Sequence, residues 1–152
     1  MSEIVIRPVA FESAVAQQLI AEALVDLGAR YGGSGDDTPV DRGEFRPPSG
    51  EFLVAYVDGA AAGCGGWRSH GDVAELKRMY TVPTARGRGI GRAILAAVER
   101  SARDHGRKRM ILECGDRQPE AIAMYETCGY ERIVDFGYYR NHGGVRSYGR
   151  DL

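Results

Sequence analysis

The chain alternates short apolar runs that suit β-strands with longer stretches in which apolar residues recur every three or four positions. Residues 3–9 (EIVIRPV) are rich in β-branched side chains and predict a first strand that ends at Pro8. From about Phe11 to Leu27 the apolar positions follow helical spacing and predict an amphipathic helix, with Gly28 as its expected stop. Residues 29–50 are rich in Gly, Pro, Asp and Ser and show no period, so they predict a long loop that has a function or hides a short helix.

Three strands joined by tight turns are predicted next. A strand near Phe52–Val57 is followed by an Asp-Gly pair at positions 58–59, which is a strong hairpin signal, and by a second strand over Ala60–Arg68. The third strand covers residues 73–82 (VAELKRMYTV) and is stopped by Pro83. This part of the chain is therefore expected to form an antiparallel meander.

The second half of the chain predicts helices between strands. A helix over about Gly89–His105 has an apolar inner face, and we expect Arg92, Glu99 and Arg103 on its solvent side, with Glu99 and Arg103 paired one turn apart. The residues expected on the inner face are Ile90, Ile94, Leu95, Val98 and Ala102.

A strand (Arg109–Cys114), a helix that begins at Pro119 and ends at Gly129, and two closing strands in residues 130–134 and 145–152 complete the chain. This order predicts one mixed α/β domain spanning residues 1–152, with a βαβ unit at its centre.

Composition narrows the class of protein. The chain has 152 residues, of which 43% are hydrophobic and 27% charged, and its formal net charge is −1, so neither a disordered chain nor a dedicated nucleic-acid binder is expected. No long apolar run suggests a membrane span. The three cysteines lack Cys-x-x-Cys spacing and the histidines lack metal spacing, so we expect no disulfide framework, no metal site and a cytoplasmic protein.

A glycine-rich junction links the third meander strand to the helix that follows it. Residues 79–99 read MYTVPTARGRGIGRAILAAVE, with glycines at 87, 89 and 91 and arginines at 86, 88 and 92. The N-terminus of a helix offers unpaired N–H groups and partial positive charge, and glycine lets a phosphate approach closely. The alternative is a turn chosen only for tight packing, with solvated arginines.

The spacing of the glycines decides which phosphate ligand fits. A Walker A loop is absent. A dinucleotide fingerprint would need glycine where Arg92 stands, although Glu113 lies at the distance expected of a ribose-binding acid, so a nucleotide-dependent oxidoreductase stays as a runner-up. The better match is Arg-x-x-Gly-x-Gly after a strand ending in Val-Pro. This motif resembles the acyl-CoA-binding motif of the GNAT superfamily of N-acetyltransferases.

The resemblance extends over Val73–Ile133. The segment AELKRMYTVP is similar to the family's fourth strand, and QPEAIAMYETCGY is similar to its late Ala-x-x-x-Tyr-x-x-x-Gly-Tyr element. It implies a central, mostly antiparallel twisted sheet with splayed fourth and fifth strands and about four flanking helices. It also implies an enzyme that transfers acetyl from acetyl-CoA to a primary amine of a small molecule or peptide. A non-catalytic acyl-CoA sensor is the alternative within the same fold.

The resemblance also implies positions for acetyl-CoA. The backbone of Met79, Tyr80 and Thr81 would hold the pantetheine amides by strand addition, and a backbone N–H near Thr81 would meet the oxyanion. Gln118 stands where many relatives have an asparagine that binds a pantetheine carbonyl or caps the helix. The residues implied for the pyrophosphate and its surroundings are Arg86, Gly87, Arg88, Gly89, Ile90, Gly91 and Arg92.

Two side chains are implied for the chemistry. Glu75 is the candidate general base, and the alternative is a solvated strand residue that balances Lys77 or Arg78. Alternation would put Glu75 on the same face as Lys77, Met79 and Thr81 unless a bulge resets the phase. Tyr125 is the candidate acid for the leaving thiolate, and the alternative is a core aromatic packed against Ile122.

The acceptor site is less defined by the sequence. The loop over residues 30–48 and the tyrosine-rich tail over residues 135–149 are candidate linings, and a homodimer is left open by the resemblance. Acidic loop residues would attract a cationic amine or be solvated, and two tail tyrosines would form an aromatic wall or close the core. His70 could reach the site from its turn. The acidic residues are Asp36, Asp37, Asp41 and Glu44, and the tyrosines are Tyr138 and Tyr139.

Overall fold

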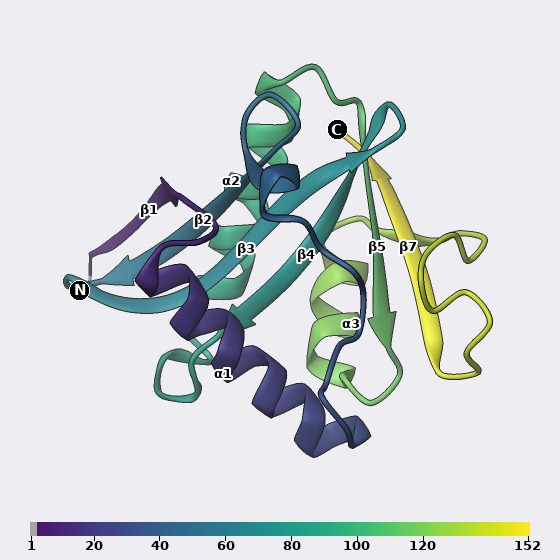
Figure 1. Cartoon of the computed structure of the whole chain (residues 1–152), viewed down its shortest axis with the longest axis horizontal. Helices are drawn as coiled ribbons and strands as arrows, with labels where there is room; N and C mark the ends of the chain where they lie inside the picture. Colours follow the sequence, from purple (N-terminus) through teal and green to yellow (C-terminus); the bar gives the residue numbers. More distant parts are fainter. Residues whose placement is uncertain (1–2) are drawn as a thin grey trace.

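The predicted strands assemble into one twisted sheet with helices on both faces in the computed structural model, which describes residues 3–152 (Figure 1). The strands are β1 (Ile4–Val9), β2 (Gly50–Val57), β3 (Ala60–His70), β4 (Val73–Thr81), β5 (Arg109–Gly115), β6 (Glu131–Arg132) and β7 (Val145–Asp151). The helices are α1 (Ala14–Tyr31), α2 (Ile90–Asp104) and α3 (Pro119–Thr127), with short 3-10 helices at Arg42–Phe45 and Pro83–Ala85.

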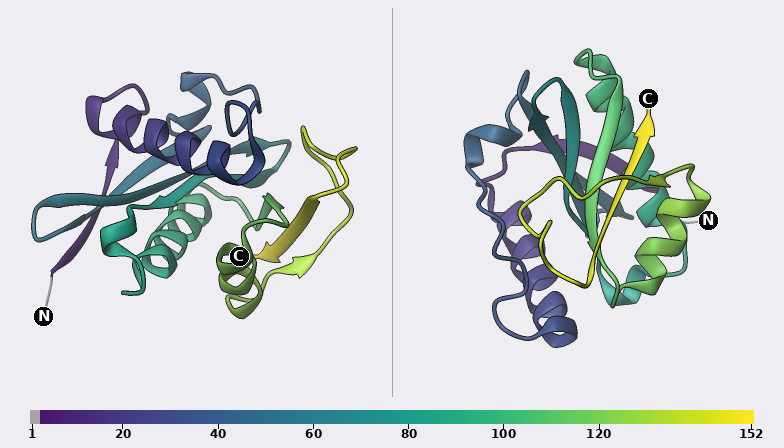
Figure 2. Two further views of the ribbon diagram at one scale, coloured as in Figure 1. Left: turned by 90° about the horizontal axis from the view of Figure 1, so that it is seen from below. Right: turned by 90° about the vertical axis from the view of Figure 1, so that its right-hand side faces the viewer.

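The sheet runs in the order β1-β2-β3-β4-β5-β7-β6, and every neighbouring pair is antiparallel except β4 and β5. That parallel pair is joined through α2, which confirms the central βαβ unit and the mostly antiparallel sheet. The left view of Figure 2 shows α1 on one face of the sheet, with α2 and α3 on the other. Because one sheet includes strands from both ends of the described chain, we propose that residues 3–152 form one domain.

The fourth and fifth strands splay apart, as the resemblance implied. They pair only at Ala74–Met110 and Glu75–Ile111, and beyond these pairs the strands diverge (Figure 1). On its other edge β4 pairs with β3, where the register passes from Gly66↔Lys77 to Cys64↔Tyr80. The chain therefore places two β4 residues opposite one of β3, which is a β-bulge.

The bulge residue Arg78 has φ +61°, a left-handed conformation that is uncommon for a residue with a side chain. The bulge changes which face each β4 side chain occupies. Lys77 lies near Asp36 on the α1 side, whereas Met79 lies beside Ile94 of α2. Glu75 and Met79 therefore do not share one face, because the bulge resets the alternation.

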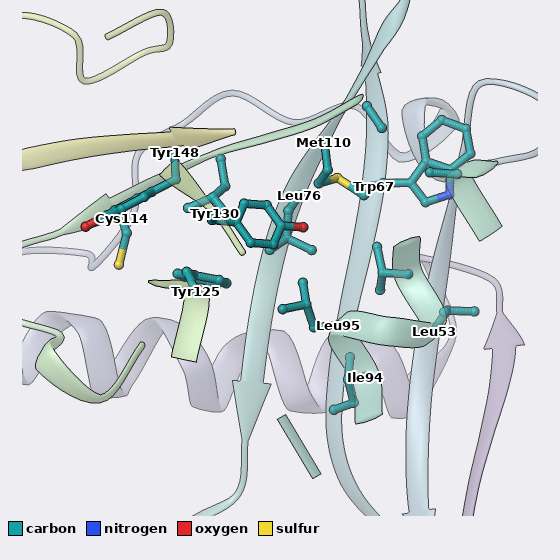
Figure 3. Close-up of a cluster of buried hydrophobic side chains, with 14 of the residues drawn as sticks. Leu53, Trp67, Leu76, Ile94, Leu95, Met110, Cys114, Tyr125, Tyr130 and Tyr148 are labelled. Carbon is teal, nitrogen blue, oxygen red and sulfur yellow. The ribbon is translucent and has the colours of Figure 1, made fainter. Parts of the chain in front are cut away.

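The main core lies between the sheet and the apolar faces of α2 and α3 (Figure 3). All five residues predicted for the inner face of α2 are buried. Trp67 of β3 is fully buried there, and its indole N–H donates to Ser101 Oγ at 2.8 Å. A second cluster lies under α1, where Phe45 and Phe52 pack edge to face at 5.9 Å. The short helix hidden in the long loop thus serves to insert Phe45 into this cluster.

Several local predictions were wrong. Gly28 does not stop α1, which continues to Tyr31 and ends at Gly32, whose φ of +83° favours glycine. A Cβ on Gly28 would lie 3.0 Å from the Gly33 carbonyl oxygen, so that glycine allows the following loop to fold back. Three α-helices, rather than about four, flank the sheet in residues 3–152, and the strand expected over residues 130–134 is reduced to Glu131–Arg132.

Glu99 does not face solvent as its helical position predicted. Its side chain is buried, it accepts from the Tyr130 hydroxyl at 2.7 Å and it pairs with Arg150 at 3.0 Å rather than with Arg103. Both partners come from the C-terminal part of the chain, which packs against α2. The helical pattern alone could not reveal that this face is covered.

Candidate active site

The glycine-rich junction is an exposed turn at the N-terminus of α2. Gly87 and Gly89 each have φ +78°, and a Cβ at either position would meet no atom within 4 Å. Glycine at these two positions is therefore explained by the left-handed backbone conformation, which other residues adopt at a cost. Gly91 differs, because its Cβ would lie 3.2 Å from Met124 Sδ of α3. That glycine permits close packing of the two helices.

Backbone N–H groups are available at this turn. Gly89 is the N-cap of α2 and provides no side-chain cap, and the first helical bond runs from Ala93 N–H to Gly89 O at 3.1 Å. The amides of residues 90–92 precede that bond and have no partner within the helix. The turn thus combines unpaired donors, the positive end of a helix dipole and space above Gly87 and Gly89, which suits a pyrophosphate.

The three arginines of the junction have different surroundings. Arg86 donates from Nε to the Thr81 carbonyl at 2.9 Å, and Arg92 donates to Thr127 Oγ1 at 2.7 Å. Arg88 is exposed on the turn. Arg86 and Arg92 therefore also hold the junction to β4 and α3, while Arg88 extends into solvent.

A cleft of about 100 Å³ separates β4 from β5 beyond their last shared pair. It is lined by β4 residues 76–79, by β5 residues 112–114 and, from the α3 side, by Gln118 and Tyr125. The edge of β4 that faces β5 is left unpaired after Glu75, so Met79, Tyr80 and Thr81 lie on a strand edge that an extended ligand can join.

Tyr125 is buried at the base of the cleft, with its ring 5.8 Å from that of Tyr130 (Figure 3). Burial raises the pKa of the Tyr125 phenol, and Cys114 and Cys128 add to the shift. The hydroxyl therefore stays protonated at neutral pH and can serve as a hydrogen-bond or proton donor. Tyr125 also belongs to the hydrophobic core, so both of its predicted environments are present.

A second, larger cavity of about 550 Å³ adjoins the cleft. It is enclosed by the end of α1, the loop after it, the end of β5 and the tail before β7. The two cavities meet at shared lining residues, which are Leu27, Asp36, Lys77, Glu113, Cys114 and Gln118. This junction of the cavities is where a molecule in the larger one would reach a group in the cleft.

Glu113 of β5 is one of two carboxylates at that junction, and Asp36 is the other. Its Oε2 accepts from the Tyr139 N–H at 3.0 Å, whereas Oε1 is buried and has no hydrogen-bond partner within residues 3–152. Burial raises the pKa of Glu113, while the Tyr139 amide and the Lys77 ammonium oppose the shift. A carboxylate with one fixed oxygen and one free oxygen is placed to accept a proton.

Glu75 lies elsewhere. Its side chain is buried and bound by Arg68 Nε at 3.0 Å, and His70 Nδ1 is 3.8 Å from the same oxygen. Neither cavity has Glu75 in its lining. The solvated alternative is wrong for this residue, because the carboxylate is buried and its partner is Arg68 rather than Lys77 or Arg78. His70 stacks edge to face on Phe136 at 5.2 Å.

Asp36 holds the loop after α1 against the β4 bulge. Its Oδ2 binds Arg78, and its Oδ1 accepts from Thr38 N at 2.9 Å and from the Tyr139 hydroxyl at 2.8 Å. Burial opposes ionisation, but the Lys77 charge and the Thr38 hydrogen bonds outweigh it, so the pKa of Asp36 falls to about 2. Of the four acidic loop residues expected at the acceptor site, Asp36 alone lines either cavity.

The other acidic residues of that loop have structural partners. Asp41 and Glu44 form a capping box around the 3-10 helix, and Glu44 also pairs with Arg68. Asp37 accepts from the Ser34 hydroxyl. Of the two tail tyrosines, Tyr139 lines the larger cavity, whereas Tyr138 is 48% exposed.

Of the predicted CoA-binding residues, Met79 and Gln118 line the cleft together with the candidate acid Tyr125, whereas residues 80–81 and 86–92 line neither cavity. Two cavity residues escaped the sequence analysis. Glu113 was considered only as a ribose-binding acid, and Lys77 only as a partner for Glu75. The sequence did hold one signal for Glu113, which is its position near the end of β5, the strand parallel to β4. Two parallel strands that splay apart place their C-terminal ends around the same cleft. Gln118 lines both cavities and is the N-cap residue of α3, but its side chain makes no capping hydrogen bond.

Two features are absent from residues 3–152. Neither α1, α2 nor α3 combines the length and apolar character needed to cross a bilayer. Nor do the described residues bring three or more His, Cys, Asp or Glu side chains together at a metal-binding spacing.

Comparisons with known proteins place these features in a family. Residues 16–130 match the model of the Acetyltransferase (GNAT) family. The chain is 37% identical over 124 residues to IAA acetyltransferase of Azospirillum brasilense, covering 80% of each chain. It is 32% identical over 126 residues to the uncharacterized N-acetyltransferase YjgM of Escherichia coli, covering 75% of each.

Solved structures share the fold. A protein of Klebsiella pneumoniae assigned to the acyl-CoA N-acyltransferases superposes with a TM-score of 0.81 at 29% identity, covering 98% of this chain and 97% of that one. A GNAT family acetyltransferase of Elizabethkingia anophelis with acetyl-CoA bound gives a TM-score of 0.71 at 15% identity, with 98% of both chains covered. The fold is thus the one that the resemblance implied.

Proposed function

The chain belongs to the acetyltransferase (GNAT) family, and we propose that it transfers the acetyl group of acetyl-CoA directly to a primary amine held in the larger cavity. The enzyme is an acetyl-CoA-dependent N-acetyltransferase, and the runner-up nucleotide oxidoreductase is set aside by the family match. One observation carries the assignment of the two substrates. The cleft beside the unpaired β4 edge and the larger cavity meet at Glu113, with the glycine-rich junction at the outer end of β4.

The chain's own groups fit a CoA thioester. The amides of residues 87–92 would bind the pyrophosphate, with Arg88 adding charge at the surface. The edge of Met79, Tyr80 and Thr81 would pair with the pantetheine amides, and Gln118 reaches the same cleft. Acetyl-CoA supplies the activated acetyl group, and the backbone of β4 would orient it toward Glu113.

Tyr125 would provide the proton for the leaving thiolate. Its phenol lines the cleft, and its raised pKa keeps the proton on oxygen, so the hydroxyl can donate a hydrogen bond to the sulfur as negative charge develops there. As the C–S bond breaks, the thiolate sulfur would take that proton, and the phenol would be restored from solvent or from the acceptor's proton. A buried hydroxyl is suited to this role, because water does not compete for it.

Glu113 is better placed than Glu75 to be the general base. The attacking amine must lose a proton as the N–C bond forms, and the buried Oε1 of Glu113 faces no competing donor within residues 3–152. Glu75 remains the base indicated by the resemblance, but its carboxylate is bound to Arg68. We propose that Glu113 takes the proton and that Glu75 and Arg68 maintain the start of β4.

The comparisons support an amine as the acceptor. The chain is 31% identical over 98 residues, 59% of its length, to an aminoglycoside N(6′)-acetyltransferase type 1 of Stenotrophomonas maltophilia. This likeness supports a primary amine on a small molecule, and a peptide amine stays as the second option. The homodimer left open by the resemblance stays a prediction.

The test is an acceptor screen that follows free thiol release from acetyl-CoA. We expect turnover with at least one class of primary amine and none with the matching dimethylated amines. Binding of CoA, seen as a raised melting temperature, without turnover on any amine would favour the non-catalytic sensor. A rise in melting temperature with NAD(P) but not with CoA would overturn the assignment.

A further inference from the structure

Lys77 is the buried cation of the acceptor site. The chain has two lysines, Lys77 and Lys108, and the side chain of Lys77 is only 8% exposed. It stands on β4 directly before the bulge at Arg78, and it lines both the cleft and the larger cavity. A lysine is rarely buried in this way unless it has a partner.

The Lys77 ammonium has an ion-pair partner in Asp36 but no hydrogen bond to it. Its nearest carboxylate oxygen, Asp36 Oδ2, is 3.7 Å away, which is too far for a hydrogen bond. Asp36 is already bound by Arg78, Thr38 and Tyr139. Within residues 3–152 the three N–H donors of Lys77 therefore make no hydrogen bond. Burial lowers the pKa of Lys77, and the charges of Asp36 and Glu75 offset only part of this shift.

The charges around the cavities point to the same need. The charged side chains that line the cleft are Lys77, Arg78, Asp36 and Glu113, and at full ionisation their charges cancel. An ammonium bound at Glu113 would leave one uncompensated positive charge in a poorly solvated site. A ligand that carries one negative charge together with its amine would keep the site neutral.

From these observations we infer that the acceptor is an amine that also carries a carboxylate, as a free amino acid does, with its amine at Glu113 and its carboxylate at Lys77. This inference rests on the proposed function and defines its substrate class. The carboxylate would accept hydrogen bonds from the Lys77 ammonium, and the nearby Glu113 would receive the proton released as the N–C bond forms. The opposite charges of the two side chains fix the direction in which such a molecule binds.

Arg117 is the other cation that lines the larger cavity, and it is a weaker candidate for the carboxylate. Its side chain is exposed, and its guanidinium donates to the Arg30 carbonyl at 3.0 Å. Unlike Lys77, it does not line the cleft beside Glu113.

The test compares matched acceptors that differ in one charge. Free amino acids, their carboxamides and the corresponding decarboxylated amines are assayed for kcat/KM by thiol release. Wild-type enzyme should prefer the carboxylate form of its best acceptor by about 10- to 100-fold, the range expected for a charge-assisted hydrogen bond at a buried site. In Lys77→Gln this preference should fall to about twofold, with kcat/KM for the carboxamide changed much less.

Three variants keep the result interpretable. Lys77→Arg retains the charge and should retain most of the preference. Lys108→Gln makes the same substitution at an exposed lysine outside both cavities and should behave as wild type. Arg117→Gln should leave the preference for short amino acids in place. CoA affinity and melting temperature, measured for each variant, report whether the fold and the thioester site are intact.

The outcomes separate the inference from the function beneath it. Equal efficiency with carboxylate and carboxamide in wild type, or a preference that survives Lys77→Gln or disappears in Arg117→Gln, would overturn the substrate class while leaving an N-acetyltransferase. Failure of every amine, with or without a carboxylate, to release CoA from an enzyme that binds it would overturn the proposed function itself. If Lys77→Gln does not fold, Lys77→Arg and wild type still decide the preference.

Discussion

The two halves of the active site are built in different ways. The junction before α2 is one continuous stretch, exposed to solvent, and its proposed binding groups are backbone amides whose positions follow from glycine conformation. The acceptor cavity is assembled from the end of α1, the loop after it, β4, β5 and the tail, and its groups are buried side chains. The hydrogen bond between Tyr139 and Asp36 joins residues that are 103 positions apart in the chain.

This difference determines where side chains can be substituted without loss of binding. A site made of backbone amides would bind the same pyrophosphate whichever side chains surround it, provided that the turn is kept. Binding in the cavity depends on the identity of each buried side chain. If one charged side chain there loses its partner, little water is available to solvate the remaining charge. We therefore expect substitutions in the cavity to have larger effects than substitutions in the junction.

Glu113→Gln should cause the largest change. It preserves the shape of the side chain and removes the proton acceptor, so kcat/KM should fall about 100- to 1,000-fold while CoA affinity stays within about twofold. Steady-state kinetics and a CoA titration measure the two quantities. A loss of less than about threefold, or a larger effect in Glu75→Gln without loss of stability, would return the base assignment to Glu75.

The same variant has a signature in stability. Burial raises the pKa of Glu113 in the folded protein, so folding favours the protonated carboxyl, and this stabilisation is lost as pH rises through the folded pKa. Glutamine does not ionise. Glu113→Gln should therefore melt at a higher temperature than wild type at pH 8, and the difference should narrow near pH 4.

Asp36→Asn should be the next largest change, and it acts on stability. The substitution leaves Arg78 and Lys77 without their shared carboxylate, at an expected cost of about 2–4 kcal/mol in the free energy of unfolding. Asp37→Asn, at the exposed neighbour, is the matched control and should cost less than about 0.5 kcal/mol. Similar losses in both variants would show that Asp36 does not hold the loop.

Asp36 also sets an acid limit. Its pKa is about 2 in the folded protein, against an ordinary value of 3.8, so its contribution is complete above the ordinary value and is lost as pH falls toward 2. The difference corresponds to roughly 2 kcal/mol. Wild type should lose this much more stability than Asp36→Asn between about pH 5 and pH 2, as measured by urea unfolding.

Tyr125→Phe should slow turnover by about 10- to 100-fold, with CoA affinity within about twofold, because only the proton donor is removed. Tyr138→Phe makes the same change at an exposed tyrosine outside both cavities and should leave kcat unchanged. Equal turnover by wild type and Tyr125→Phe would discard Tyr125 as the acid and leave it as a core residue.

The smallest effect is expected at the junction. Gly89→Ala introduces a Cβ at φ +78°, which should cost about 1 kcal/mol of stability and weaken CoA binding by about 5- to 10-fold. Gly106 has φ +80°, and a Cβ there also meets no atom within 4 Å, so Gly106→Ala carries the same strain at the other end of α2. CoA binding should be normal in that variant. Weakened binding in both would attribute the effect to the helix rather than to the turn.

The comparison also explains how far the sequence could be read. The junction, the tight turns between β2, β3 and β4, and the inner face of α2 were predicted because each depends on residues close together in the chain. The burial of Glu99 and the free oxygen of Glu113 were missed, because each depends on a distant segment. Glu99 is covered by the segment that contains Tyr130, and Glu113 is held on one oxygen by the tail at Tyr139. The face of the sheet on which Met79 lies depends on the bulge at Arg78, and the order of residue types within β4 does not indicate a bulge.

The central claim is that the backbone of the junction and the free edge of β4 bind acetyl-CoA. Amide hydrogen exchange, followed by NMR with and without CoA, tests it at each residue. We predict slower exchange at residues 87–92 and along the β4 edge over Met79–Thr81, with Gly106 unchanged. Protection confined to the larger cavity, with the amides of residues 87–92 exchanging as fast as in the free protein, would contradict it.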